Sequence, residues 1–588
     1  MTRADGDRRG VASGVAPADP AAVRGLDAQV DRTLGRMTLE EKVGQLFVTY
    51  AYGDSAGTTS PADVAANRSL HGVNNGAQLV AKYHLGGVIY FGWARNVRNP
   101  NQIARLSNGL QQAAMRSGAR IPLLISTDQE HGSVSRVGQP ATQFPGSMAL
   151  GADGNDRDAY TAALITGREL AAIGINQNFA PVSDVNVNPR NPIIGVRSIG
   201  SSPKLVAALS SAQVRGYQAA RVAATAKHFP GHGDTTVDSH IGMPVINHTR
   251  TQWETIDRPP FQANVDQRVD AIMTAHIVVP SLDPSGTPAT LSHPMISDVL
   301  RGQMGYDGVV ITDALGMAGV RAKYGTARVP VLALKAGVDQ LLMPPSLPKA
   351  YAAVLAAVRS GELTEQRIDE SVYRILRVKF ARGAFDRPYV DTSKVGSIVG
   401  TAEHRRAAQQ ITDKTITLVK NDRGLLPLAR KSGKSVLLTG WGTSSGLGGK
   451  MASRGVSVRS YETGMAPTGA RIATAVQMAR AADVTVVTTN KGWSSPRQSA
   501  LVAALLRSGK PVIVAAVDTP YDLAHFASAP TYVATYSSSD ASLTSLAAVL
   551  FGELNPTGNL PVSIPRARGS GPPLYDVGFG LSTGRSGS

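Results

Sequence analysis

Eight short apolar runs, each followed by a turn and a helix-like stretch, constrain the fold of this chain more than any other feature. The runs are rich in Val, Ile and Leu and recur about every 30–50 residues. Near-continuous apolar strands that alternate with helices predict a parallel sheet covered on both faces, and eight such units favour a (β/α)8 barrel over a doubly wound sheet. The runs span residues 44–50, 86–91, 122–127, 175–182, 222–229, 270–277, 307–313 and 337–343.

The same pattern divides the chain into domains. Thr38 and Glu41 predict a capping box that opens a helix near the start of the barrel, whereas residues 52–76, rich in Gly, Ser and Asn, predict a long loop. After a helical stretch at 363–383 the barrel pattern stops, and a second α/β region follows. We therefore predict an α/β protein with a flexible leader at 1–27, a catalytic (β/α)8 TIM-type barrel at 28–385, a linker at 386–411 and an α/β (αβα) sandwich domain at 412–588.

Composition excludes several kinds of chemistry. The chain contains no Cys, which excludes disulfides, thiol nucleophiles and thiolate metal sites. It has no apolar run of 18 residues or more, so we expect no membrane span.

The formal net charge is +17, and residues 401–588 contain 20 Lys and Arg against 10 Asp and Glu. These basic residues are scattered and not interleaved with aromatics, which argues against a nucleic-acid partner and leaves a solvated basic face or contact with an anionic cell-wall polymer.

Polar and charged side chains follow the predicted barrel strands at the points where the strands end. The carboxyl ends of all strands of a (β/α)8 barrel meet on one rim, and that rim holds the catalytic groups. Because five of the eight strands end in this way, we interpret the set as an active site. Its members are residues 128–131 after the third strand, Asp184 and then Arg197 after the fourth, Lys227 and His228 after the fifth, His276 after the sixth and Asp313 after the seventh.

The densest stretch is KHFPGHGDTTVDSH at 227–240, which contains three His and two Asp. Two interpretations stay open, and the first is a divalent metal site, since imidazole and carboxylate are common ligands. The second is a proton-transfer pair, in which Asp238 orients His240 because residues i and i+2 of an extended segment point to the same side. Asp313 is a candidate nucleophile for an anomeric carbon, which together with that pair predicts retaining glycoside hydrolysis.

Residues 227–240 closely resemble the signature of the bacterial β-N-acetylglucosaminidase branch of glycoside hydrolase family 3. The resemblance covers roughly residues 35–565, and from residue 412 onward it is to the second α/β sandwich domain of that family. It implies that Asp238 and His240 form an acid/base dyad and that Asp313 is the nucleophile. The sugar-binding positions that it implies are Asp128, Arg136, Arg197, Lys227 and His228.

The resemblance implies exo-acting hydrolysis of terminal β-linked N-acetylglucosamine (GlcNAc) from peptidoglycan fragments or chitooligosaccharides, with no cofactor and no metal. Three alternatives remain, namely a phosphorylase that uses the same residues, a metal-dependent hydrolase and a non-catalytic cell-wall-binding protein. A phosphorylase is chemically reasonable because an imidazole acid/base does not repel an anionic acceptor. We expect a monomer whose partner is a carbohydrate. The sequence as written has no signal-peptide pattern, which predicts the cytoplasm, or an extracellular or wall-associated location if the true start lies upstream.

Overall fold

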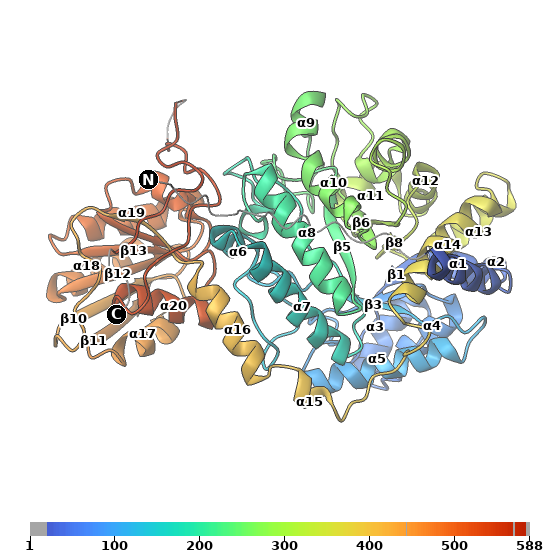
Figure 1. Ribbon diagram of the computed structural model, residues 1–588, viewed down its shortest axis with the longest axis horizontal. Helices are drawn as coiled ribbons and strands as arrows, with labels where there is room; N and C mark the ends of the chain where they lie inside the picture. The colour runs from blue at the N-terminus through green and yellow to red at the C-terminus, as the bar shows by residue number, and fades with distance from the viewer. Residues whose placement is uncertain (1–19, 443, 568–570, 584–588) are drawn as a thin grey trace, which may run out of the picture.

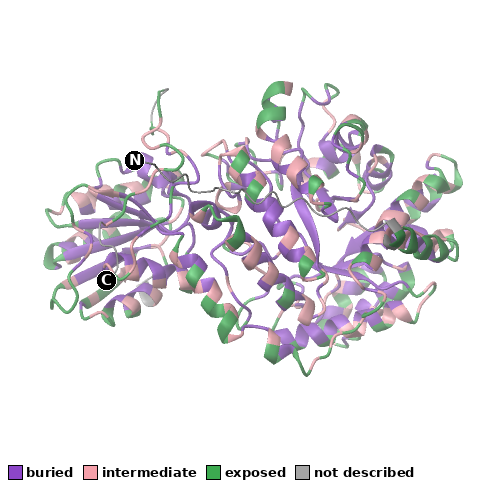
Figure 2. Cartoon of the chain, viewed as in Figure 1, coloured by how far each residue is buried: buried purple, intermediate pink, exposed green. Residues whose placement is uncertain are grey.

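The computed structural model describes residues 20–442, 444–567 and 571–583. Figure 1 shows a larger domain drawn from blue to yellow and a smaller domain drawn from orange to red beside it. Buried residues concentrate in the strands of both domains (Figure 2). No helix in the described part of the chain is long and apolar enough to cross a membrane.

The larger domain is a parallel eight-stranded barrel, as the sequence predicted. Its strands pair in the order β7-β6-β5-β4-β3-β2-β1-β8. A parallel bridge between Ile311 and Gln340 links the first and last of these strands and closes the ring. The strands are β1 (Phe47–Thr49), β2 (Gly87–Ile89), β3 (Leu124–Thr127), β4 (Gln177–Asn178), β5 (Ala223–Phe229), β6 (Ala271–Thr274), β7 (Val309–Thr312) and β8 (Leu341–Leu342).

Helices follow the strands and cover the outside of the barrel. The predicted capping box is confirmed, because Oγ1 of Thr38 accepts from the N–H of Glu41 at 3.3 Å and the Glu41 carboxylate accepts from the N–H of Thr38 at 2.8 Å. The helices are α2 (Leu39–Gln45), α4 (Gly76–Tyr83), α5 (Pro100–Met115), α6 (Ser147–Asp153), α7 (Asp156–Ala172), α8 (Pro203–Ala219), α9 (Arg250–Ile256), α10 (Arg258–Asp266), α11 (Ala318–Tyr324), α12 (Arg328–Ala336), α13 (Leu347–Arg359) and α14 (Glu365–Ala381), with the 3₁₀ turns η1 (Gly195–Arg197) and η2 (Ala289–Leu291) and the π-helix η3 (Pro294–Gln303).

The smaller domain is an αβα sandwich, which confirms the predicted class. Its sheet runs β11-β10-β12-β13-β14-β9, parallel except for β9, which is antiparallel to β14. One apolar cluster packs α18 and α19 on one face of the sheet, and another packs α17 and α20 on the other. The elements are α16 (Ala402–Asp413), β9 (Thr417–Asn421), β10 (Ser435–Gly440), α17 (Ser444–Ala452), β11 (Ser457–Glu462), α18 (Gly469–Ala481), β12 (Val484–Thr489), η4 (Gly492–Ser494), α19 (Pro496–Leu506), β13 (Val512–Ala516), η5 (Pro520–His525), β14 (Thr531–Ala534) and α20 (Asp540–Leu550).

Two segments expected to be irregular contain helices. The flexible leader predicted at 1–27 is wrong for residues 20–27, where α1 (Pro20–Leu34) begins, and residues 1–19 lie outside the described residues. Helix α1 packs against α14 and fully buries Val30, so an apolar stripe holds it to the barrel. Within the predicted loop at 52–76, α3 (Pro61–His71) is fixed by the buried Asn67, whose amide exchanges two 2.9 Å hydrogen bonds with the backbone of Tyr52.

The linker predicted at 386–411 is also partly helical, with α15 (Val395–Ile398) and most of α16 inside it. The buried carboxylate of Glu169 in α7 accepts from the N–H of Gly400 at 2.9 Å and lies 2.8 Å from Nδ1 of His404. The same carboxylate accepts from the N–H of Thr142 at 2.8 Å and from its hydroxyl at 2.7 Å. The connection is therefore packed against the barrel rather than free.

Helix α6 joins the two domains. It lies in the barrel part of the sequence, yet its apolar side chains belong to an apolar cluster of the smaller domain. The helix approaches the barrel closely at Gly151, where a Cβ atom would lie 1.8 Å from the carbonyl oxygen of Ile199. The shared cluster contains Met148, Ala149 and Ala152 of α6 together with Leu560, Val562 and Ile564. The domains therefore share buried apolar surface.

Candidate active site

A cavity of about 530 Å³ lies at the carboxyl ends of the barrel strands. This volume is typical of small-molecule sites and accommodates one or two sugar rings. Seven of the eight predicted site residues line it, namely Asp128, Arg136, Arg197, Lys227, His228, His240 and Asp313. The eighth, Asp238, contacts His240 rather than the cavity itself.

Asp313 follows β7 directly and is partly exposed in the cavity. Its Oδ1 accepts from the N–H of Ala314 at 2.7 Å. Burial raises the pKa of Asp313, but the imidazoles of His228 and His276, the Ala314 N–H and the Lys227 ammonium outweigh it and hold that pKa below its usual value. The carboxylate is therefore ionised at neutral pH, as a carboxylate nucleophile must be.

Charged groups form a buried network on one wall of the cavity. Nε and Nη2 of Arg197 donate to the two carboxylate oxygens of Glu130 at 2.9 Å each. Nζ of Lys227 lies 2.7 Å from Oε1 of Glu130 and 2.8 Å from Oδ1 of Asp128. Arg136 is more loosely placed, with Nη2 4.0 Å from Oδ2 of Asp128. This pairing holds Arg197 and Lys227 in fixed positions, from which they can donate to hydroxyls in the cavity.

Asp184 fixes two histidines beside this network. Its Oδ2 lies 2.7 Å from Nδ1 of His228, and its Oδ1 accepts from the N–H of His232 at 2.7 Å. Burial raises the pKa of Asp184, but the contacts with His228 and His232 outweigh it and lower that pKa. Nε2 of His228 lies 3.3 Å from Nη2 of Arg197. His228 is thus held between Asp184 and Arg197.

The predicted dyad lies on the loop that follows β5. Nδ1 of His240 is 2.8 Å from Oδ1 of Asp238, and the same oxygen accepts from the His240 N–H at 2.8 Å. Partial burial raises the pKa of Asp238, but these two hydrogen bonds outweigh it and hold that pKa below its usual value. The His240 side chain is 58 % exposed. The carboxylate therefore orients a ring that solvent and ligand can both reach.

The base of this loop is anchored although the dyad is exposed. The carbonyl of His232 accepts from Nδ2 of Asn191 at 2.9 Å, and Nε2 of the His232 ring lies 3.0 Å from the hydroxyl of Ser239. Burial lowers the pKa of His232 to about 4. His232 is therefore neutral at neutral pH and serves to hold the loop against the barrel.

His276, which the sequence placed at the end of the sixth strand, is buried and does not line the cavity. Its Nδ1 lies 2.8 Å from the hydroxyl of Thr290 and its Nε2 3.0 Å from the carbonyl of Ala314. Burial lowers its pKa. His276 therefore supports the backbone next to Asp313.

Aromatic rings form another wall. Phe91 and Trp93 stack with ring centroids 4.8 Å apart, and Trp93 is 54 % exposed. The guanidinium of Arg136 lies over the Phe91 ring, 5.7 Å from its centroid. An exposed indole beside fixed polar groups suits the apolar face of a sugar ring.

Sequence reasoning did not assign roles to several residues at this site. Glu130 lies two positions after Asp128, and the i, i+2 spacing was a signal that both point the same way. Asp184 was recognised at a strand end without a partner. Trp93 and Lys491 also line the cavity, and Lys491 comes from the smaller domain, so no local pattern connected it with the barrel.

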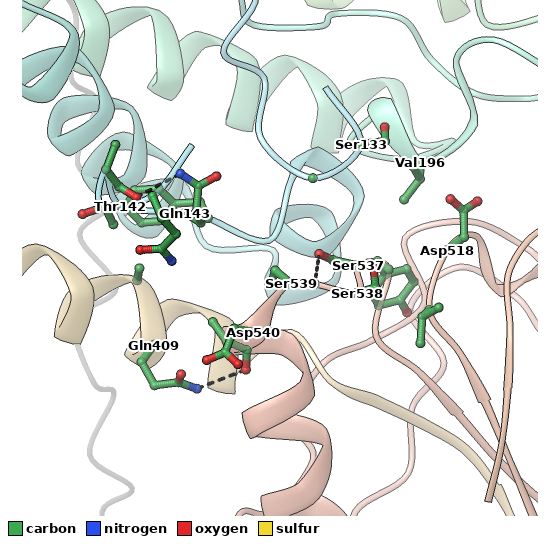
Figure 3. A pocket seen from close by; sticks show the side chains of 18 of the residues that line it. Ser133, Thr142, Gln143, Val196, Gln409, Asp518, Ser537, Ser538, Ser539 and Asp540 are labelled. Carbon is green, nitrogen blue, oxygen red and sulfur yellow. Dashed lines mark hydrogen bonds between the residues drawn. The ribbon is translucent and has the colours of Figure 1, made fainter. Parts of the chain in front are cut away.

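A second cavity, of about 500 Å³, lies between the two domains. Figure 3 shows Ser133, Thr142 and Gln143 on its barrel side and Asp518 and residues 537–540 on the other. None of the described residues that line it is a predicted site residue. A thin wall separates the cavities, because Val196 lines the second one while its neighbour Arg197 lines the first.

In the ranges that the structure describes, no group of three or more His, Asp or Glu side chains could hold a metal ion. The His and Asp residues of 227–240 are instead engaged in pairwise contacts, such as Asp238 with His240 and Asp234 with His248.

Two models of one protein family match the two domains of this chain. Residues 38–378 match the glycosyl hydrolase family 3 N terminal domain, and residues 416–583 match the glycosyl hydrolase family 3 C-terminal domain. These matches fall within the predicted domains at 28–385 and 412–588.

Individual relatives agree with this family. The chain is 39 % identical over 376 residues to beta-hexosaminidase A of Pseudoalteromonas piscicida, an alignment covering 60 % of this chain and 62 % of that protein, which is less than two thirds of its length. It is 29 % identical over 569 residues to a beta-N-acetylglucosaminidase/beta-glucosidase of Cellulomonas fimi, covering 91 % and 95 %. A solved family 3 beta-N-acetylglucosaminidase from Paenibacillus sp. str. FPU-7 superposes with a TM-score of 0.82 at 39 % identity, covering 90 % of this chain and 99 % of that one. This chain therefore belongs to glycosyl hydrolase family 3 and contains both domains of that family.

Proposed function

We propose that this chain is a retaining, exo-acting β-N-acetylglucosaminidase that removes terminal β-linked GlcNAc from peptidoglycan fragments or chitooligosaccharides. The observation that carries the proposal is that Asp313 and His240 line one cavity with all five predicted sugar-binding residues. The names of the relatives from Pseudoalteromonas, Cellulomonas and Paenibacillus support N-acetylglucosamine as the sugar that is released.

The reaction has two steps. In the first, Asp313 attacks the anomeric carbon, the bond to the leaving oxygen breaks, and protonated His240 gives that oxygen its proton. The sugar is then held as an ester of Asp313. In the second, His240 takes a proton from water, the water oxygen attacks the same carbon, and Asp313 leaves as a carboxylate. Two inversions retain the β configuration.

Asp238 acts through His240. Its Oδ1, 2.8 Å from Nδ1 of the ring, keeps the imidazole in one orientation and stabilises the imidazolium from which the first step starts and which the second step forms again. In the pocket, Arg197 and Lys227 donate to the sugar hydroxyls, and Asp128 accepts from sugar hydroxyls. Their buried pairing with Glu130 fixes the donors before substrate arrives, which is the condition for strong electrostatic stabilisation.

Covalent trapping tests the nucleophile. A 5-fluoro-N-acetylglucosaminyl fluoride slows the second step, so the ester accumulates and peptide mapping by mass spectrometry locates it. We expect the label on Asp313 of the wild-type chain and none on the Asp313→Asn variant. A label on another residue, or turnover with retained configuration and no protein label, contradicts this mechanism; the latter is the signature of catalysis by the substrate's own acetamido group.

Measurement of the products and rates of turnover separates the alternatives. We expect free GlcNAc as the product even when phosphate is present, and unchanged rates in EDTA. Release of GlcNAc 1-phosphate would show a phosphorylase instead. Loss of activity to the chelator would show a metal-dependent hydrolase, and binding without turnover would show a cell-wall-binding protein.

Two further properties are part of the proposal. We expect a monomer, which light scattering of the purified chain measures directly. We also expect the basic residues of 401–588 to contact an anionic cell-wall polymer. Co-sedimentation with purified anionic wall polymer that disappears as salt rises supports this contact, and retention at high salt or no retention at all contradicts it.

A further inference from the structure

The smaller domain contributes one described residue, Lys491, to the lining of the catalytic cavity. Lys491 follows β12 at the carboxyl edge of the sheet. The chain passes from β10 to β11 on one side and then returns to β12 on the other side of β10, so β10 and β12 flank the point where the strand order reverses. Open α/β sheets bind ligands at the carboxyl edge beside such a point. The binding edge of this domain therefore faces the barrel site.

The backbone at Lys491 is held in an unusual conformation. Its φ is +48°, in the left-handed region that non-glycine residues rarely adopt. Its carbonyl accepts from the N–H of Ser494 at 3.0 Å and from the Ser494 hydroxyl at 2.9 Å. On the other side, the backbone of Asn490 exchanges hydrogen bonds of 3.1 and 2.8 Å with the amide of Gln498. These contacts fix the turn that carries Lys491 to the cavity.

Lys491 differs from the other cations of the cavity in its pairing. Arg197 and Lys227 share the carboxylate of Glu130, and Lys227 also contacts Asp128. Lys491 is exposed and has no acidic partner within 4.0 Å among the residues that the structure describes. Asp518 lines a small pocket together with Lys491, and burial raises the pKa of Asp518 overall, although the Lys491 charge acts to lower it. The Asp518 carboxylate accepts from the N–H of Thr519 at 2.8 Å and also lines the interdomain cavity near Val196 (Figure 3). The ammonium of Lys491 is therefore available to a ligand.

The position of Lys491 decides which part of the substrate it can meet. The terminal sugar must reach Asp313 and the network of Lys227 and Arg197, which all belong to the barrel. Lys491 comes from the smaller domain and is exposed to solvent, so we place it beside the part of the substrate that extends outward from the anomeric carbon. That part is the leaving group. A phosphate acceptor would enter on this same side, because the acceptor attacks the anomeric carbon on the face that the leaving group vacates, so use of added phosphate is one of the outcomes that the test separates.

We infer that Lys491 is a binding position for an anionic leaving group, one whose sugar bears a carboxylate, so that the smaller domain selects the glycan from which the barrel removes GlcNAc. This inference rests on the proposed function and narrows its substrate to acidic glycans. An exposed ammonium contributes modestly to binding but strongly to selection, because it attracts the charged ligand and does nothing for a neutral one.

A matched pair of substrates tests the inference. One is GlcNAc β-1,4-linked to N-acetylmuramic acid, whose lactyl group carries a carboxylate, and the other is its lactyl methyl ester, which is the same size and neutral. For Lys491→Met we expect the ratio of kcat/KM for the acid to that for the ester to fall about 3- to 10-fold relative to wild type. Lys491→Arg keeps the charge and should keep most of the ratio. Rising salt should lower the wild-type ratio toward that of the Met variant.

The control variant is Lys510→Met, which removes an exposed charge just before β13, at the opposite edge of the sheet. It should leave the ratio at the wild-type value. An unchanged ratio in Lys491→Met overturns the inference, and so does an equal fall in Lys510→Met. A change confined to the use of added phosphate as acceptor also overturns it.

Failure of the proposed function looks different from failure of the inference. If wild type cleaves neither disaccharide nor an aryl β-N-acetylglucosaminide, the function itself is wrong. If it cleaves the aryl glycoside and treats acid and ester alike, the function stands and the role of Lys491 falls.

Discussion

Replacing Glu130 with Gln tests how the site holds its cations. The Glu130 side chain is 2 % exposed and accepts from Arg197 at 2.9 Å twice and from Lys227 at 2.7 Å. Gln has the same size but keeps only one acceptor oxygen and turns an amide NH₂ toward a cation. Arg197 then loses its carboxylate altogether, whereas Lys227 keeps Asp128 at 2.8 Å.

The size of the effect follows from these contacts. Removing one partner of a buried ion pair destabilises a protein by about 3–5 kcal/mol. Loss of two charge-assisted hydrogen bonds at about 1.5–3 kcal/mol each gives a similar figure. We therefore expect the free energy of unfolding to fall by about 3–5 kcal/mol. Because one fixed donor at a developing charge is worth about 10²- to 10³-fold in rate, we expect kcat/KM to fall by about 10²-fold or more.

Urea unfolding and aryl β-N-acetylglucosaminide hydrolysis measure the two effects. The matched control is Glu169→Gln, another buried carboxylate, which binds Thr142, Gly400 and His404 away from the cavity. It should lose stability and keep kcat/KM under conditions where it is folded. Wild-type kcat/KM in folded Glu130→Gln, or an equal loss in Glu169→Gln, would refute the reasoning.

Three further predictions concern other groups. The hydrogen bonds of His248 with Asp234 and Asp257 raise its pKa to about 10. The contribution of His248 to stability is therefore fully present below its unfolded pKa of about 6.5 and is lost as pH rises through about 10. The urea midpoint should fall from pH 7 to 10.5 for wild type, and it should fall less for His248→Gln. Burial lowers the pKa of Lys379, whose Nζ donates only to the Gln45 side chain in the described structure, so unfolding takes up a proton below about pH 10.4. Lys379→Met should therefore be more stable than wild type at pH 7, with an advantage that shrinks as pH rises, and a constant advantage would contradict this. Asp238→Asn should lower kcat about 10²- to 10⁴-fold with poor leaving groups and less with good ones, so a uniform loss across a series of aryl glycosides would exclude an acid/base role.

The barrel was predictable because its strands carry their signal in a few consecutive residues. β7 and the apolar run at 307–313 coincide, and Asp313 is the next polar residue on the rim. Helix α3 gave no such signal, since the polar Asn67 rather than an apolar stripe holds it in place. The order within the predicted linker gave no signal for a related reason, because it depends on Glu169, a residue more than two hundred positions earlier in the chain.

In the active site, too, local contacts were predictable from the sequence and long-range contacts were not. Asp238 and His240 are two positions apart, so their contact follows from local geometry. Glu130 could be placed on the rim, but only the fold shows that it pairs with Arg197 and Lys227. Lys491 reaches the cavity through the docking of one domain on another, which no periodicity in the sequence records.

Helix α6 has a consequence for how this protein loses its structure. Met148, Ala149 and Ala152 are buried only while the smaller domain is folded, and on the other side Leu150 packs in a cluster with Ala408 and Ile411 of α16. Melting the smaller domain would expose these side chains and remove two partners from the carboxylate of Glu169. Heating should therefore give a single cooperative transition, and a chain cut after residue 385 should yield a barrel that aggregates rather than a free catalytic domain.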